Sequence, residues 1–142
     1  MLYVSTRGKT DLVSSAHAIT RGLAGDGGLF VPQNIPAMRM VDIKAMEHKP
    51  YTERAIDVLL QYLTDFSEDE LRECVNAAYA KDKFGDNPVP LVQVNDNTGV
   101  LELWHGPTSA FKDMALQLLP HLLTRSMKNT GETNKVVILV AT

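Results

Sequence analysis

An unbroken run of apolar residues near the end of the chain, at positions 136–140, constrains the fold more than any other segment. A run without polar alternation is typical of a strand that is covered on both faces. Before it, residues 100–104 are predicted to form a strand that ends at Gly106, and an amphipathic helix is predicted over residues 109–123. Pro120 should kink or break this helix, because it removes one backbone hydrogen bond. Strand, helix and buried strand together predict a right-handed crossover unit of the α/β class.

Helical patterns dominate the first half of the chain. Residues 52–63 place their aliphatic side chains on one helical face, which predicts an amphipathic helix packed against a core. Ser67 and Glu70 form the capping-box pattern of a second helix that extends to about Lys81. We expect these two helices to pack as a hairpin. The other elements predicted here are strands at residues 2–6 and 29–31 and helices at residues 14–23 and 41–47.

The segment at residues 85–88, which contains glycine and proline, marks a change from helical to strand-rich sequence. We expect a domain boundary close to it. Two strands are then predicted at residues 89–94 and 100–104. The loop between them is rich in asparagine and contains a glycine, which favours a hairpin.

Composition narrows the classes of function. The chain has 142 residues, 44% of them apolar, and a net charge of −3, and no basic run interleaves with aromatic residues. These features argue against a nucleic-acid surface and favour a small soluble substrate. No apolar run is long enough to span a bilayer, so no membrane partner is expected. The single cysteine, Cys74, cannot form an internal disulfide and should be buried, which fits a cytoplasmic protein.

Lys112 is the residue with the clearest chemistry. If Ser109 caps the helix, Lys112 lies in its first turn, where unpaired backbone N–H groups and the helix dipole disfavour a protonated amine. Asp113 opposes this effect in part. Schiff-base chemistry needs a neutral amine, and desolvation beside Phe111 and Trp104 would act in the same direction. The alternative is an ordinary solvated lysine, which is the commonest fate of lysine and which the neighbouring residues alone favour.

Residues 105–113, with the sequence His-Gly-Pro-Thr-Ser-Ala-Phe-Lys-Asp, resemble the pyridoxal-phosphate attachment motif of the threonine synthase family. Further segments resemble the family in the same order along the chain, at residues 3–8, 22–32, 102–105 and 135–142. Three departures are small. Trp104 stands where phenylalanine is frequent, Ser109 stands where an apolar residue is usual, and Pro120 interrupts the helix. None of them removes a chemical group that the motif requires.

The resemblance implies an α/β fold with a small N-terminal α-rich domain and short strands over residues 1–86. Residues 87–142 would be the start of a PLP-binding three-layer α/β domain that is truncated. Family members are several times longer, so the remainder of the same polypeptide is an expected partner. The groups that bind the cofactor phosphate and the pyridine nitrogen would lie in that remainder. Without later strands, the run at residues 136–140 would leave an unpaired edge, and we expect oligomerisation or aggregation.

The resemblance also implies a reaction. A PLP-dependent carbon–oxygen lyase of this family converts O-phospho-L-homoserine and water to L-threonine and phosphate. Lys112 would hold pyridoxal 5′-phosphate as a Schiff base and then move protons at the α and β carbons of the substrate. Phe111 would flank the pyridine ring or pack in the core. The other candidate cofactor contacts, each with an alternative role in the turn or helix start, are His105, Thr108 and Asp113.

Other functions remain open at this point. The chain alone is expected to be inactive, and it is alternatively a non-catalytic structural or interaction fragment of a threonine synthase-like protein. A related PLP-dependent phospho-amino-acid lyase is a further possibility. No nucleotide-type phosphate loop is present, because the Gly-x-x-x-x-Gly-Lys-Ser/Thr pattern does not occur. No metal site is expected, since His17, His48 and His121 lack ligand spacing.

Overall fold

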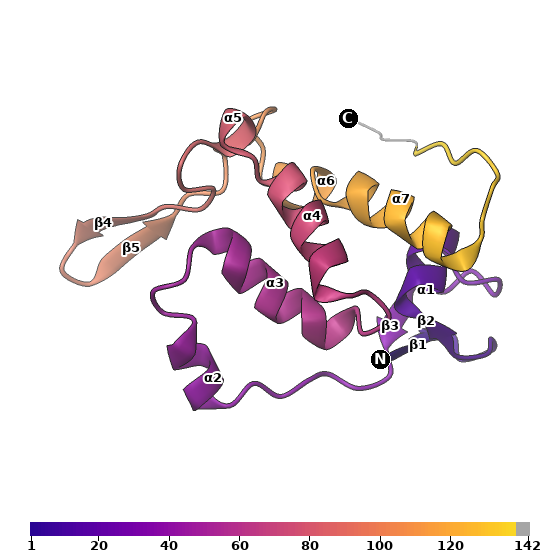
Figure 1. Cartoon of the computed structure of the whole chain (residues 1–142). Helices are drawn as coiled ribbons and strands as arrows, with labels where there is room; N and C mark the ends of the chain where they lie inside the picture. Colours follow the sequence, from indigo (N-terminus) through magenta and orange to yellow (C-terminus); the bar gives the residue numbers. More distant parts are fainter. Residues whose placement is uncertain (139–142) are drawn as a thin grey trace.

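The computed structural model describes residues 1–138. In chain order the elements are β1 (Leu2–Ser5), β2 (Val13–Ser14), α1 (Ser15–Arg21), β3 (Phe30–Pro32), α2 (Met40–Ala45), α3 (Tyr51–Tyr62), α4 (Glu68–Ala78), α5 (Lys81–Phe84), β4 (Leu91–Asn95), β5 (Thr98–Leu101), α6 (Asp113–Leu116) and α7 (Leu119–Thr130). Helices α3, α4, α6 and α7 form the middle of the molecule (Figure 1). The small sheet and α1 lie at one end, and the β4–β5 hairpin lies at the other.

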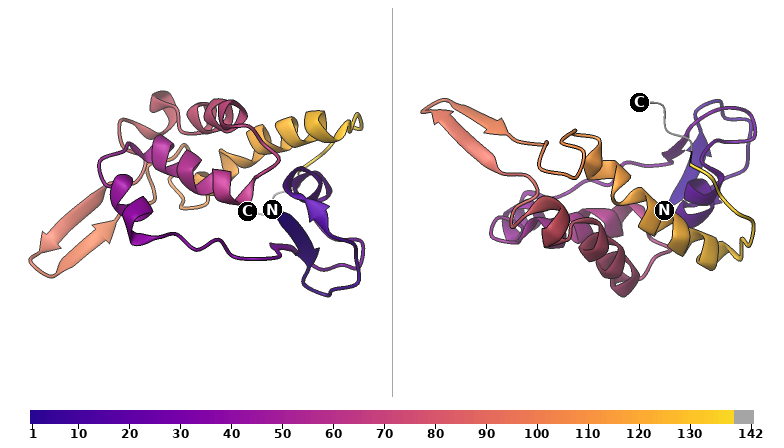
Figure 2. Two further views of the ribbon diagram at one scale, coloured as in Figure 1. Left: turned by 60° about the horizontal axis from the view of Figure 1, so that its bottom comes forward. Right: turned by 90° about the horizontal axis from the view of Figure 1, so that it is seen from above.

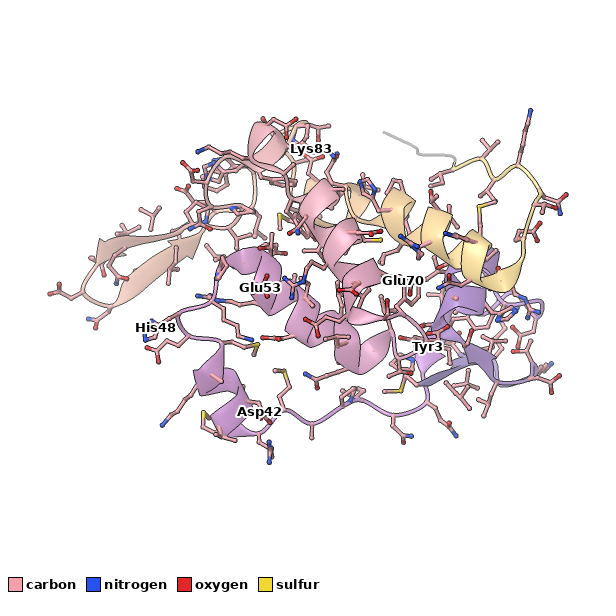
Figure 3. All side chains as sticks on the ribbon, viewed as in Figure 1. Tyr3, Asp42, His48, Glu53, Glu70 and Lys83 are labelled. Carbon is pink, nitrogen blue, oxygen red and sulfur yellow. The ribbon has the colours of Figure 1, made fainter. Side chains whose placement is uncertain are left out.

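The N-terminal sheet has the strand order β2-β1-β3, and both pairings are antiparallel. Tyr3 of β1 pairs with Pro32, and Ser5 pairs with Phe30. The hydroxyl of Tyr3 donates a hydrogen bond of 3.1 Å to the backbone carbonyl of Tyr62, at the end of α3 (Figure 3). This bond joins the sheet to the helical part of the molecule.

Asp26 fastens the loop before β3 to the end of β1. Its carboxylate accepts hydrogen bonds from the Ser5 hydroxyl at 2.6 Å, the Gly28 amide at 2.9 Å and the Lys9 amide at 3.1 Å. A Cβ on Gly28 would clash with the Ser5 Oγ, so this close approach requires glycine. The hydrogen bond from Ser5, followed by those from the amides, holds the pKa of Asp26 below its usual value.

The predicted capping box at the start of α4 is confirmed. The Glu70 side chain accepts the Ser67 N–H at 2.8 Å, and the Ser67 hydroxyl accepts the Glu70 N–H at 3.2 Å. Helices α3 and α4 pack together as expected, and both contribute to the core. One core cluster contains Ala16, Leu63, Phe66, Leu71, Cys74 and Leu122, and the other contains Ile56, Val75, Ala78, Tyr79 and Phe84.

The predicted hairpin is also confirmed, with Leu91 opposite Leu101 and Val92 opposite Val100. All nine residues of β4 and β5 are exposed, and the hairpin extends away from the helices (Figure 2). The prediction of a crossover unit is not met within the described residues. Residues 136–138 form no helix or strand, and residues 139 and 140 lie outside the described part. A central strand needs neighbours on both edges, and β4 and β5 instead pair with each other.

The break predicted near Pro120 is confirmed. Helix α6 ends at Leu116 and α7 begins at Leu119, so Pro120 lies in the first turn of α7, where its missing N–H costs no hydrogen bond. The prediction that Ser109 caps a helix is wrong, because Ser109 has a φ of 55° and α6 begins only at Asp113. Helix α4 ends before the predicted Lys81, which instead begins the short helix α5. Among the described residues, no helix combines the length and apolar content that crossing a bilayer requires.

Candidate functional site

The turn between β5 and α6 is organised around the carboxylate of Asp113. Asp113 is 0% exposed, although it is charged and begins the short helix α6. The Thr108 backbone N–H donates to its Oδ2 at 2.7 Å. The Thr108 hydroxyl lies 3.0 Å from both carboxylate oxygens. A buried carboxylate is costly unless donors satisfy it, and Thr108 supplies two of them.

Gly106 allows this arrangement because it lies directly against Asp113. A Cβ on Gly106 would lie 2.6 Å from the Asp113 Oδ2 and 2.8 Å from its Cγ, closer than real side-chain contacts. The carbonyl of Gly106 accepts the Ser109 N–H at 3.0 Å, and Ser109 has a φ of 55°, in the left-handed region. The turn therefore depends on one glycine and one left-handed residue.

Lys112 is exposed and adopts an α-helical backbone conformation, with φ −61° and ψ −24°, just before α6. It borders a pocket of about 550 Å³ whose other lining residues are almost all apolar. These residues are Tyr51, Val89, Leu101, Leu103, Phe111, Met114, Ala115 and Leu116. Among the described residues that line this pocket, Lys112 is the only one with a charged side chain.

The expected desolvation of Lys112 by aromatic neighbours is not found in the described residues. Lys112 is itself exposed, and Phe111 and Trp104 are 66% and 50% exposed, so the lysine is not buried between these rings. The expected helix dipole is also weak, because α6 has only four residues and few peptide units align. Water, rather than protein, surrounds much of the Lys112 side chain.

His105 is held at the end of the hairpin by its neighbours in sequence. Its Nε2 lies 2.6 Å from the Oε2 of Glu102, and its ring stacks on Trp104 with centroids 5.8 Å apart. This contact with Glu102 was not predicted. The separation of three residues between Glu102 and His105 is the sequence feature that could have indicated it. The arrangement suits a histidine that orders the Gly-Pro turn.

Tyr79 anchors the other side of α6 to the core. Its hydroxyl donates to the Met114 carbonyl at 2.7 Å, and its ring packs edge-on against Tyr51 and Phe84. Burial raises the pKa of Tyr79, with a smaller contribution from Tyr51, so the hydroxyl stays a neutral donor. No motif predicted this role for Tyr79.

The structure brings four of the five predicted site residues into two pairs. Lys112 and Phe111 border the pocket, whereas Thr108 and Asp113 bond to each other in the turn between β5 and α6. His105 bonds to Glu102 instead. The apolar pocket residues from α3 and β5 were not predicted, because distant segments supply them without a motif. The described residues contain no cluster of three metal-ligating side chains.

Comparison with known proteins gives consistent matches. Residues 2–79 match the family described as "Threonine synthase N terminus". The threonine synthase of Pseudomonas aeruginosa is 40% identical over 144 residues, which cover 100% of this chain and 30% of that protein. The human protein "Threonine synthase-like 1" is 35% identical over 89% of this chain and 17% of its own length.

Solved structures of threonine synthases also match this chain. PLP-bound threonine synthase from Brucella melitensis superposes with a TM-score of 0.85 and 39% identity, over 92% of this chain and 28% of that chain. Threonine synthase from yeast gives a TM-score of 0.82 and 32% identity, over 91% of this chain and 27% of that chain. The α/β class with small sheets is thereby confirmed as that of the N-terminal part of these structures. This chain spans about 30% of the length of the Pseudomonas relative.

Proposed function

Because this chain belongs to the threonine synthase family, we propose that it is the part of a threonine synthase that carries the cofactor lysine, Lys112. The reaction proposed for the whole enzyme converts O-phospho-L-homoserine and water to L-threonine and phosphate, a carbon–oxygen lyase reaction. The observation that carries the proposal is the position of Lys112, in the motif at residues 105–113 and at the rim of an apolar pocket.

The residues present fit pyridoxal 5′-phosphate in part. A pocket of about 550 Å³ with apolar walls suits a planar aromatic ring, and Lys112, an exposed residue, is one of the residues that line it. Phe111 also lines this pocket and is exposed, so it is available to flank the ring. The cofactor, when bound, supplies the electron sink for the chemistry at the substrate.

The roles proposed for the chain's own residues rest on the family resemblance and are compatible with these positions. Lys112 would hold the cofactor by its amine and would serve as the base that moves protons at the α and β carbons of the substrate. His105, Thr108 and Asp113 shape the turn that presents Lys112. The cytosol is the compartment that we propose, on the basis of a single, buried and unpaired cysteine, Cys74.

The 142 residues alone are proposed to be inactive, because they span only 30% of the length of the Pseudomonas enzyme. The test is incubation of the chain with pyridoxal phosphate, reduction with borohydride and peptide mapping. We expect one dominant adduct, on Lys112, and its loss in Lys112→Arg. Adducts scattered over the exposed lysines, or none, would overturn the proposal for this chain and favour a non-catalytic fragment.

A second assay addresses the substrate in a longer protein that contains this sequence. Release of phosphate from O-phospho-L-homoserine with equimolar L-threonine is the expected outcome. Phosphate released with a different amino-acid product, or from a different phospho-amino acid, would instead identify a related lyase. The adduct test and this assay are independent, because the first does not require turnover.

A further inference from the structure

We infer that Asp113 is a positioning residue, which fixes the turn at residues 106–109 through Thr108 and thereby directs Lys112 toward the pocket. The inference rests on the proposed function of Lys112 but concerns a different residue and a different kind of role. Asp113 acts on the site indirectly. It is the next residue after Lys112, and it accepts hydrogen bonds within the turn.

The carboxylate of Asp113 lies in a buried environment. Asp113 is fully buried, and none of the ion pairs found among the described residues includes it. Its hydrogen-bond donors from side chains and the turn are the N–H and the hydroxyl of Thr108. A buried charge satisfied by one residue ties that residue firmly in place. Thr108 is exposed, so its own packing does not hold it there.

Gly106 and Asp113 are in close steric contact. Gly106 leaves no room for a Cβ beside the carboxyl group of Asp113, so the turn and the side chain fit each other closely. Ser109 lies in the left-handed region, with a φ of 55°, and its N–H donates to the carbonyl of Gly106. The carboxyl group of Asp113 thus fixes the conformation of residues 106–109 through its contacts with Gly106 and Thr108.

The burial of Asp113 also bears on the exposure of Lys112, the residue before it. Successive residues of a helical turn point about 100° apart, so an inward Asp113 turns Lys112 outward, where it borders the pocket. On the other side, the Tyr79 hydroxyl holds the Met114 carbonyl. Two anchors, Asp113 and Met114, therefore follow Lys112 directly in sequence and fix the backbone that carries it.

The experiment combines hydrogen exchange with adduct mapping in the same variants. Asp113→Ala removes both acceptors, and we expect the Thr108 amide to exchange about tenfold faster or more. We expect the adduct on Lys112 to fall about tenfold, with labelling of the exposed Lys44 on α2 unchanged. Asp113→Asn retains one acceptor, and its amide can donate to the Thr108 hydroxyl, so it should restore most of both signals.

Thr108→Val and Thr108→Ser form a matched pair at an exposed position, in case Asp113→Ala does not fold. The valine variant should lower labelling of Lys112, and the serine variant should restore it. Equal Thr108 exchange in wild type and Asp113→Ala would overturn the inference, as would unchanged labelling of Lys112. Loss of labelling in Asp113→Asn with slow exchange retained would also overturn it, because the charge would then act on the cofactor directly.

Failure of the proposed function gives a different pattern. If the wild-type chain takes no adduct on Lys112, the cofactor assignment is wrong for this chain. The exchange measurement needs no cofactor and still decides whether Asp113 holds the turn. The two ideas therefore fail through separate measurements.

Discussion

The hydroxyl of Tyr79 donates a 2.7 Å hydrogen bond to the backbone carbonyl of Met114 and so links the end of α4 to the one-turn helix α6. The bond spans 35 residues in sequence. It connects the second core cluster to the segment that carries Lys112. The position of the candidate site therefore depends on the packing of the N-terminal helices.

Tyr79→Phe tests this link. The substitution keeps the ring that packs against Tyr51 and Phe84 but removes the donor to Met114. We expect the free energy of unfolding to fall by about 1 kcal/mol, measured by urea denaturation. We also expect faster hydrogen exchange at the start of α6. An unchanged unfolding midpoint together with unchanged exchange would show that the bond does not anchor α6.

Gly106→Ala should destabilise the turn at residues 105–113. The added methyl group would meet the Asp113 carboxyl group, and overpacking of this kind costs about 1–3 kcal/mol. Gly25→Ala is the matched control, because a Cβ there meets no atom within 4 Å. Chemical denaturation of both variants provides the measurement. Equal stability of the two would contradict the close contact between Gly106 and Asp113.

Ser126→Ala should leave the chain equally stable or more stable. Ser126 in α7 is fully buried, and its hydroxyl has no hydrogen-bond partner among the described residues. Removing an unsatisfied buried hydroxyl gains up to about 1 kcal/mol. Ser15→Ala is the contrasting control. The Ser15 hydroxyl donates a hydrogen bond to Asp65, so its removal should lower the stability of the chain. A thermal or urea midpoint that falls in Ser126→Ala would contradict this account.

Asp26 should make stability depend on acid pH. Its folded-state pKa is lowered, chiefly by the Ser5 hydroxyl, so its contribution is present above the unfolded pKa of about 4 and is lost as pH falls through the folded value. Asp26→Asn should therefore show a flatter decline of stability in acid than the wild type. Asp11→Asn, at an exposed position, serves as the control. Parallel acid-unfolding curves for Asp26→Asn and the wild type would refute this assignment.

Local rules in the sequence predicted the N-terminal half of the fold well. The capping box at Ser67 and Glu70 is formed by neighbouring residues, so it could be recognised without knowledge of the rest. The same kind of rule failed at Ser109. There the carboxylate of Asp113 accepts a hydrogen bond from the N–H of Thr108, five residues earlier. The helix begins four residues after Ser109. A hydrogen bond across five residues therefore stands where a cap by Ser109 was expected.

Long-range features were harder to predict. The run at residues 136–140 was expected to be a buried strand, but a strand also needs partners, and residues 136–138 have none among the described elements. Likewise, Phe111 and Trp104 were expected to desolvate Lys112, but both are exposed. The assignment of the cofactor chemistry to Lys112 stays a prediction of the motif, whereas the pocket beside it is lined in part by α3 and β5 residues that no local pattern indicated. The division of the chain near residue 86 stays a prediction.

The most direct test of the central claim is the intact mass of the wild-type and Lys112→Arg chains after pyridoxal phosphate and borohydride. We expect one dominant adduct per wild-type chain at low cofactor concentration and the loss of that adduct in Lys112→Arg under the same conditions. Equal labelling of the two proteins would contradict attachment at Lys112, because the exposed lysines elsewhere on the surface would then account for the reaction.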